Sequence, residues 1–235
     1  QDTNGDGYLL ATRRGRLVFS EVVSGNFKTS NPVINDVWEP VYIMNKIMLG
    51  LYNAYTMCGL DEAKPLLVKM ADWFGHGIID KLSHDDMQKL LVCEHGSINE
   101  SYVNVYQITG DDKYLRWAEC LNDEDMWVPL SKGEDILHGW HANTQIPKFT
   151  GFTNVCRFNN DNNLYNAARL FWDIVTTKHT WSNGGNSTGE HFFPEGEFAD
   201  RVSNFGGPES CNSVNMMRLT EILLQMKADV KYIDY

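Results

Sequence analysis

The sequence lacks long apolar runs and clusters of basic residues. No apolar stretch approaches the roughly 18 residues that suggest a membrane span, so we expect a soluble chain. The 20 Lys and Arg residues face 31 Asp and Glu residues, which gives a net charge of −11 without any basic run. Because neutralising phosphates requires a basic patch, we expect neither nucleic acid nor a membrane surface as a partner, and a neutral or cationic ligand fits better.

Cysteine is also scarce. The five cysteines stand at positions 58, 93, 120, 156 and 211, widely spaced and odd in number. This pattern shows neither a disulfide framework nor a CxxC zinc motif. The cysteine pattern does not decide the cellular compartment, and we slightly favour a bacterial periplasmic or secreted location over the cytoplasm.

A repeat of helical patterns is present in a chain of ordinary globular composition, with 43% hydrophobic residues. Each of the segments 51–74, 102–121 and 152–175 has an apolar-periodic run, a break and a second periodic run. The breaks are Gly59, Gly110 and Asn160, about 50 residues apart. Gly and Asn tolerate the left-handed conformation that ends a helix, and the Asp that follows each break can cap the next helix. Each segment therefore predicts a helix hairpin.

Hairpins that repeat every 50 residues or so form either an open solenoid or a closed ring. The long polar links at 24–36, 122–140 and 179–208 favour an all-α (α/α)6 toroid with loops on one face. Closing such a ring takes about six hairpins, and this chain supplies about four. We therefore expect residues 1–235 to be an incomplete part of a single (α/α) barrel domain.

Three polar stretches carry the chemistry-bearing residues. Glu190 lies in GGNSTGEHF (184–192), Glu209 and Cys211 lie in GPESC (207–211), and HANTQIPK spans 141–148. Taken alone, Glu190 could be a solvated loop carboxylate and Cys211 a small buried hydrophobe. Glu209 could simply favour the positive end of a helix that begins near Asn212. The glycine-lined approach to two carboxylates and a thiol nevertheless suggests a chemical site.

Five ordered motifs give these stretches a family context. They are EHGSINESYVNVYQITGDDKYL (94–115), HGWHANTQIPKFTGF (138–152), ARLFWDIV (168–175), GGNSTGEHF and GPESCNSVNMMRLT (207–220). With them the chain resembles, essentially end to end, the bacterial β-L-arabinofuranosidase families of glycoside hydrolases. The resemblance implies a catalytic (α/α)6 barrel followed by β-sandwich domains that this chain does not contain. It also implies a Zn²⁺ ion held by one Glu and three Cys, with one zinc-bound thiolate attacking the anomeric carbon.

The resemblance also implies roles for individual residues. Glu190 matches the general acid/base, and Glu209 and Cys211 match two of the four zinc ligands. The other two ligands, the nucleophile among them, would form an adjacent cysteine pair that the printed sequence does not contain. The residue types suit the reaction, because hydrolysis with retention needs a nucleophile and a proton donor, and zinc keeps a thiol as thiolate.

Five further residues are predicted to contact the sugar. His95 and His141 resemble histidines that bind sugar hydroxyls, and an imidazole can donate to one hydroxyl while it accepts from another. Gln145 belongs to the same polar cluster as His141, and Trp140 could offer a stacking face. Asn45 stands where the family usually has His, so it can still form hydrogen bonds but cannot titrate, which puts the subsite preference in doubt.

A structural role is also open for His141. It could lie at a helix N-terminus with Asn143 or Thr144 as the cap and Pro147 in the first turn.

Ser210 stands where the family commonly has Thr. This departure from the family pattern is milder than that at Asn45, because Ser keeps the hydroxyl group.

Three classes of function follow. The first is a retaining glycoside hydrolase that releases L-arabinofuranose from β-L-arabinofuranosides of plant glycans. The second is another reaction on the same fold, a sugar epimerase or an unsaturated-uronide hydrolase, which would use His or Asp without zinc. The third is a non-catalytic carbohydrate-binding remnant. All three predict a carbohydrate partner.

Overall fold

The computed structural model describes residues 4–203 and 205–234, which divide into two compact units at Asp123 and Glu124. The chain is 61% helical, and its three described strands have only two residues each, so the predicted all-α class is confirmed. Every helix in the described ranges is too short or too polar to cross a lipid bilayer.

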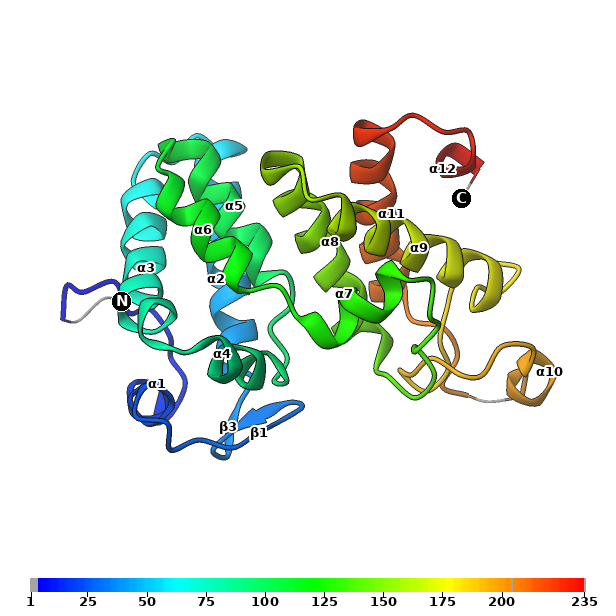
Figure 1. Ribbon diagram of the computed structural model, residues 1–235, viewed down its shortest axis with the longest axis horizontal. Coiled ribbons are helices and arrows are strands. Elements are labelled where there is room, and N and C mark those ends of the chain that lie inside the picture. The colour runs from blue at the N-terminus through cyan, green and yellow to red at the C-terminus, as the bar shows by residue number, and fades with distance from the viewer. Residues whose placement is uncertain (1–3, 204, 235) are drawn as a thin grey trace. The chain divides into compact units, whose positions relative to one another are not determined.

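The first unit holds six α-helices, a three-stranded meander and one short 3-10 helix among its described residues (Figure 1). In chain order these are α1 (Gly15–Val23), β1 (Thr29–Ser30), β2 (Val33–Ile34), β3 (Val37–Trp38), α2 (Pro40–Thr56), α3 (Ala63–Gly77), the 3-10 helix (Ile79–Lys81), α4 (His84–Leu91), α5 (Ile98–Thr109) and α6 (Asp112–Cys120).

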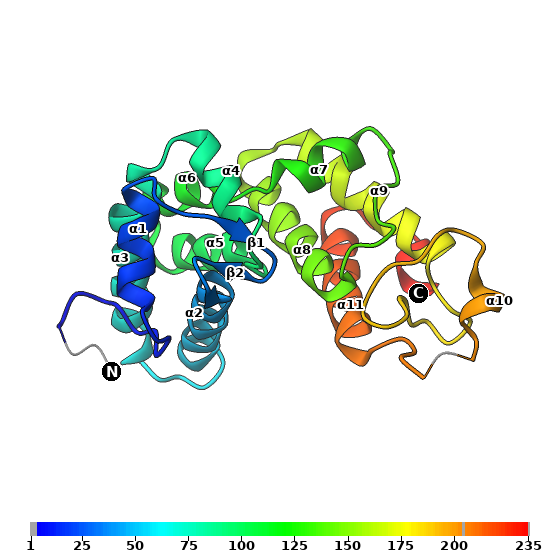
Figure 2. The ribbon, with the colours of Figure 1, turned by 90° about the horizontal axis from the view of Figure 1, so that it is seen from below.

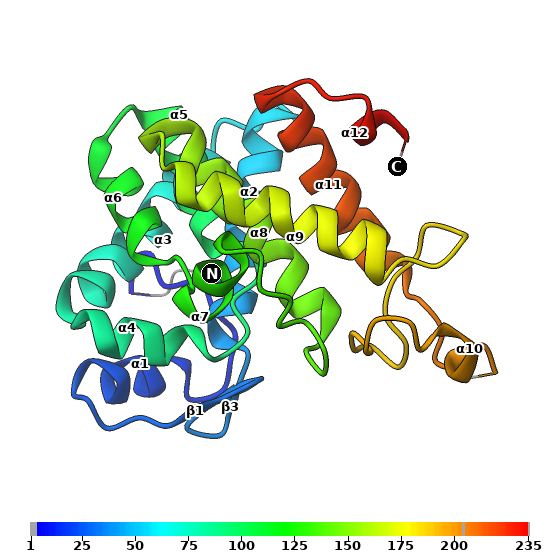
Figure 3. The same ribbon diagram turned by 45° about the vertical axis from the view of Figure 1, so that its right-hand side comes forward.

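The described residues of the second unit are mostly helical, and a long, largely irregular segment joins α9 to α11 (Figure 3). Its helices are α7 (Glu124–Ser131), α8 (Ala142–Asn159), α9 (Asn162–Lys178), α10 (Phe198–Arg201), α11 (Ser210–Met226) and α12 (Lys231–Asp234).

The three predicted hairpins are present. Helix α2 packs against α3, α5 against α6, and α8 against α9. All three break residues have positive φ: 67° at Gly59, 71° at Gly110 and 58° at Asn160. Gly110 and Asn160 are the C-caps of α5 and α8. The residue types at the breaks therefore identify the turns correctly, because they are the ones that adopt this backbone at low cost.

The capping prediction holds at two of the three hairpins. Asp111 accepts a hydrogen bond from the backbone N–H of Lys113 at the start of α6. Asp161 accepts from Asn163 and Leu164 at the start of α9. At the first hairpin the prediction is wrong, since Glu62 is the N-cap of α3 and makes no side-chain cap hydrogen bond. The linker there is longer, so Asp61 falls one position before the cap.

The long links contain more structure than expected. The link at 24–36 forms strands β1 and β2, which continue into β3 as an antiparallel meander leading directly to α2 (Figure 2). The link at 122–140 contains α7, which packs on α9. Among the described residues of the third link, at 179–208, the four-residue helix α10 and isolated bridges interrupt irregular backbone.

Helix α8 forms the centre of the second unit. All but one of the residues from Ala142 to Cys156 are buried, and the Phe149 ring stacks on Phe171 of α9 with centroids 3.8 Å apart. Phe171 and Trp172 are core residues.

Helix α11 lies alongside α8 in parallel orientation. Asn215 hydrogen-bonds to Asn143 near the start of both helices, and Cys156 contacts Met226 near their ends. The N-termini of α8 and α11 therefore lie at the same end of the pair (Figure 1).

Candidate active site

The start of α8 is tied to the stretch that contains Glu190. Backbone hydrogen bonds run from Gly139 N to Phe192 O over 2.8 Å and from Phe192 N to Trp140 O over 2.9 Å. A third runs from Ala142 N to Glu190 O over 2.8 Å. This short ladder holds two stretches together that are about 50 residues apart in sequence.

His141 is the N-cap of α8. Its Nδ1 accepts a hydrogen bond from the backbone N–H of Thr144 at 3.2 Å. The expectation that Asn143 or Thr144 would be the cap is therefore wrong, and Pro147 lies inside the helix beyond its first turn. Because Nδ1 is an acceptor, the neutral ring carries its hydrogen on Nε2. That Nε2 lies 3.8 Å from Oε2 of Glu190, too far for a hydrogen bond but within ion-pair range.

Glu190 has an unusual backbone and an exposed carboxylate. Its φ is 69°, and Ser187 and Gly189 before it also have positive φ. A non-glycine residue in this region is uncommon and persists where its surroundings enforce it, as at ligand-binding sites. The Glu190 side chain is 59% exposed, so the strained turn presents its carboxylate to solvent and the His141 ring.

Glu209 and Cys211 form a corner at the N-terminus of α11. Glu209 is the N-cap but makes no side-chain cap hydrogen bond. Its Oε2 instead lies 3.7 Å from Sγ of Cys211, which donates to it. Burial and the Glu209 charge raise the pKa of the Cys211 thiol. Cys211 is only partly buried, so the alternative of a buried small hydrophobe is wrong.

The donor atoms of this corner fit two ligands of one zinc ion. Tetrahedral coordination with Zn–S and Zn–O bonds of about 2.3 and 2.0 Å places sulfur and oxygen about 3.5 Å apart. The observed 3.7 Å is close to that separation. Among the described residues there is no group of three or more His, Cys, Asp or Glu side chains that could hold a metal. The corner therefore supplies two donors, and a closed zinc site needs further ligands.

The Glu190 stretch and the Glu209–Cys211 corner lie next to each other. Asn212 donates from Nδ2 to Ser187 Oγ at 2.8 Å, and the backbone N–H of Gly189 donates to Gly206 O. A Cβ on Gly185 would clash with the ring of Pro208, so this ring packs directly against the Gly185 backbone. Two carboxylates, a thiol and an imidazole thus gather at the common N-terminal end of α8 and α11.

Comparison with known proteins identifies the family of the chain. The family described as Beta-L-arabinofuranosidase, GH127 catalytic domain, matches residues 1–235. The chain belongs to this GH127 family. A search among curated proteins gave no match.

Solved structures share the fold. A GH127 β-arabinofuranosidase is 21% identical with a TM-score of 0.68, over 85% of this chain and 32% of that one. The GH127 β-L-arabinofuranosidase of Geobacillus stearothermophilus T6 is 18% identical, also with a TM-score of 0.68, over 98% of this chain and 39% of that one.

A GH76 α-1,6-mannanase from Salegentibacter sp. HEL1_6 is 15% identical with a TM-score of 0.53, over 94% of this chain and 68% of that one. These likenesses show the helical toroid fold that the hairpin repeat predicts. The chain spans about a third of the length of the two GH127 structures.

Trp140 and Gln145 also lie near the start of α8 in this GH127 chain. Trp140 is 40% exposed and adjoins His141, so its ring is accessible. Gln145 is fully buried, and neither its amide oxygen nor its amide nitrogen has a hydrogen-bond partner. An unpaired buried amide is costly, which makes Gln145 a position where a ligand or water can add bonds.

Asn45 and His95 belong to the first unit of the GH127 chain. Asn45 is fully buried in α2 and donates to Ser101 Oγ at 2.9 Å, while its Oδ1 has no partner. His95 is also buried, with Nδ1 3.1 Å from the Cys93 carbonyl. A Cβ on Gly96 would meet Asn45 Oδ1 at 2.5 Å, so the two stretches are in close contact. Their predicted contact with sugar stays a prediction.

Two further candidate site residues, Asn212 and His191, were not identified from the sequence. Asn212 links the corner to the Glu190 stretch, and His191 packs its ring edge-on against His141 with centroids 5.3 Å apart. Both follow a predicted residue directly in sequence. The polar run Ser210–Cys211–Asn212 is the one available signal for Asn212, and it does not indicate which partner the amide meets.

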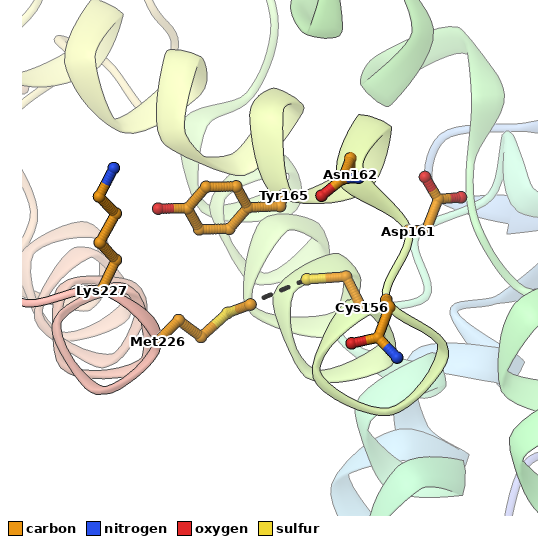
Figure 4. A pocket seen from close by; sticks show the side chains of 7 residues that line it. Cys156, Asp161, Asn162, Tyr165, Met226 and Lys227 are labelled. Atoms are coloured by element: carbon orange, nitrogen blue, oxygen red, sulfur yellow. Dashed lines mark hydrogen bonds between the residues drawn. The ribbon is translucent and has the colours of Figure 1, made fainter.

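Two of the cavities outside this cluster belong to the second unit. One of about 260 Å³ lies at the opposite end of α8 and α11, where Cys156 and Met226 form its floor and Tyr165 and Lys227 lie beside it (Figure 4). Burial raises the pKa of the Cys156 thiol to about 12, so this cysteine stays protonated. The other, of about 280 Å³, adjoins the cluster and is lined by Trp181, Arg201 and Pro208 among others.

Proposed function

We propose that this chain carries part of the active site of a retaining glycoside hydrolase that releases L-arabinofuranose from β-L-arabinofuranosides of plant glycans. The supporting observation is the pairing of the Glu190 stretch with the Glu209–Cys211 corner at one end of α8 and α11. Membership of the GH127 catalytic-domain family supports the reaction class. A carbohydrate is accordingly the proposed partner.

Glu190 is the proposed general acid/base. A retaining reaction needs one group that protonates the leaving oxygen and then takes a proton from the attacking water. The Glu190 carboxylate is exposed on a turn whose backbone is fixed to the start of α8, so it can reach a bound glycoside. The Nε2–H of His141 lies beside this carboxylate, so it can donate to a sugar hydroxyl bound there.

Glu209 and Cys211 are the proposed zinc ligands from this chain. When bound, zinc would hold a coordinated cysteine as thiolate at neutral pH, and the attacking thiolate would belong to the adjacent cysteine pair that the printed sequence does not contain. The corner presents one carboxylate oxygen and one sulfur at a separation that suits a single ion. The Cys211 thiol donates to Glu209, which keeps the two side chains next to each other.

Substitution of Glu190 tests the proposal. In the whole gene product, Glu190→Gln should lower kcat/KM by about 10² to 10⁴ for a β-L-arabinofuranoside with a poor alkyl leaving group. A p-nitrophenyl glycoside needs little protonation of its leaving group, so its cleavage should fall much less. The measurement is the release of L-arabinose and of p-nitrophenol under steady-state conditions.

The matched control is Glu195→Gln. Glu195 is an exposed carboxylate paired with Lys178 at 3.0 Å, outside the cluster, and its substitution should leave both rates unchanged. Equal rates for Glu190→Gln and the unsubstituted protein on the poor substrate would remove Glu190 from the acid/base role. Glycan binding without release of arabinose would instead favour the carbohydrate-binding remnant.

A further inference from the structure

Asn212 contacts both halves of the proposed site through a single amide group. It lies in the first turn of α11, and its side chain is fully buried. Its Oδ1 lies 3.8 Å from Sγ of Cys211 and is an alternative acceptor to Glu209 for the thiol hydrogen. Its Nδ2 donates to Ser187 Oγ at 2.8 Å and, more weakly, to Asn186 O at 3.4 Å. The Asn212 amide, next to the Glu209–Cys211 corner, thus holds the loop that carries Glu190.

The loop needs such a restraint. Ser187 and Glu190 both have positive φ, which is unfavourable for residues with a side chain unless neighbouring contacts enforce it. The Glu190 carboxylate itself contributes little, because it is exposed and lies 3.8 Å from Nε2 of His141, too far for a hydrogen bond. The loop is fixed from the α8 side by the Ala142–Glu190 backbone hydrogen bond and from the α11 side by Asn212.

A retaining glycosidase needs its acid/base at a fixed distance from the attacking group, which in the proposed site would be bound to the same zinc ion as Glu209 and Cys211. Carboxyl pairs in retaining enzymes keep a separation of about 5 to 5.5 Å, and a displacement of 1 Å can cost about 10²-fold in rate. In this chain the proposed acid/base, Glu190, lies on a loop, and the Glu209–Cys211 corner lies at the N-terminus of a helix. A buried side chain that bonds to both is the direct means of fixing one relative to the other.

We propose that Asn212 is a positioning residue that holds the Glu190 loop in register with the Glu209–Cys211 corner. This inference rests on the proposed function, because it assigns Asn212 an effect on turnover that acts through Glu190. A buried asparagine with a purely structural role would lower stability without any preference for one class of substrate.

The test compares two substrates in Asn212→Ala within the whole gene product. We expect kcat to fall by about 10²-fold for an alkyl β-L-arabinofuranoside and by much less for the p-nitrophenyl glycoside, because only the former depends strongly on Glu190. In a Glu190→Gln background the same substitution should cost little more, since groups that act together are not additive. Amide hydrogen exchange should speed up in residues 184–192, and the zinc content should stay the same.

Asn215→Ala is the matched control. Asn215 is on the same helix and donates a similar amide hydrogen bond, at 2.8 Å, but to Asn143 of α8 instead of the loop. We expect it to show no preference between the two substrates. If Asn212→Ala is too unstable to purify, Ser187→Ala removes the hydroxyl that accepts the Asn212 hydrogen bond. It should also lower kcat more for the alkyl glycoside than for the p-nitrophenyl glycoside, by a smaller factor than Asn212→Ala.

The outcomes separate the inference from the proposed function. Equal losses on both substrates, or losses that add to those of Glu190→Gln, would overturn the role of Asn212 and leave the acid/base assignment intact. A Glu190→Gln variant without any leaving-group preference would instead overturn the proposed function itself.

Discussion

At the scale of single residues, His141 combines a structural and a chemical position. One ring nitrogen caps α8 and thereby fixes the ring, and this leaves the other nitrogen facing Glu190. A histidine cap is less common than Ser, Thr, Asp or Asn, which explains why the sequence pattern indicates the polar residues after it. The two roles can be separated by substitution.

Replacing His141 with Asn and with Ala should separate stability from turnover. His141→Ala loses the cap, so the free energy of unfolding should fall by about 0.5–2 kcal/mol. Asn is a good N-cap, so His141→Asn should recover most of that stability in urea titrations. Both variants lack the Nε2–H beside Glu190, and both should therefore lose turnover in steady-state assays. Full activity in His141→Asn would show that the ring is only a cap.

At the scale of elements, the sequence determines the hairpins well and the links poorly. Gly110 and Asn160 mark turns because their residue types favour the backbone that ends a helix, a local property. Helix α7 was not predicted, since it is only eight residues long and contains Pro129. Its formation depends on packing against α9, which no local pattern reveals.

Two glycines in neighbouring helices test the packing of the first unit. A Cβ on Gly75 of α3 would clash with the ring of Trp117, whose Nε1 is fixed by a 2.7 Å hydrogen bond to Asp80. Gly75→Ala should therefore lower the free energy of unfolding by about 1–3 kcal/mol in chemical denaturation, despite the better helix propensity of Ala.

Gly50 of α2 is the matched control. It is exposed, and an added Cβ would meet no atom within 4 Å. Gly50→Ala should raise the free energy of unfolding by about 0.5–1 kcal/mol through helix propensity alone. A gain of stability in both variants would contradict the tight contact between α3 and α6.

At the scale of the whole molecule, the site is only partly readable from the sequence. Glu190, Glu209 and Cys211 stand out because their residue types match a family pattern. Their proximity depends on the parallel packing of α8 and α11, which brings Ser187 to Asn212 across 25 residues. The burial of Asn45 and Gln145 likewise follows from packing. Residue type therefore suggests the chemistry, and only the fold shows which groups meet.

The central claim is that the Glu190 loop and the Glu209–Cys211 corner form one zinc-dependent site. The most direct measurement is anomalous diffraction at the zinc edge from crystals of the whole gene product grown with zinc. The account predicts a zinc peak bonded to Glu209 and Cys211 at about 2.0 and 2.3 Å, beside the Glu190 loop. A well-ordered corner without zinc, or a zinc ion bound elsewhere in the protein, would contradict it.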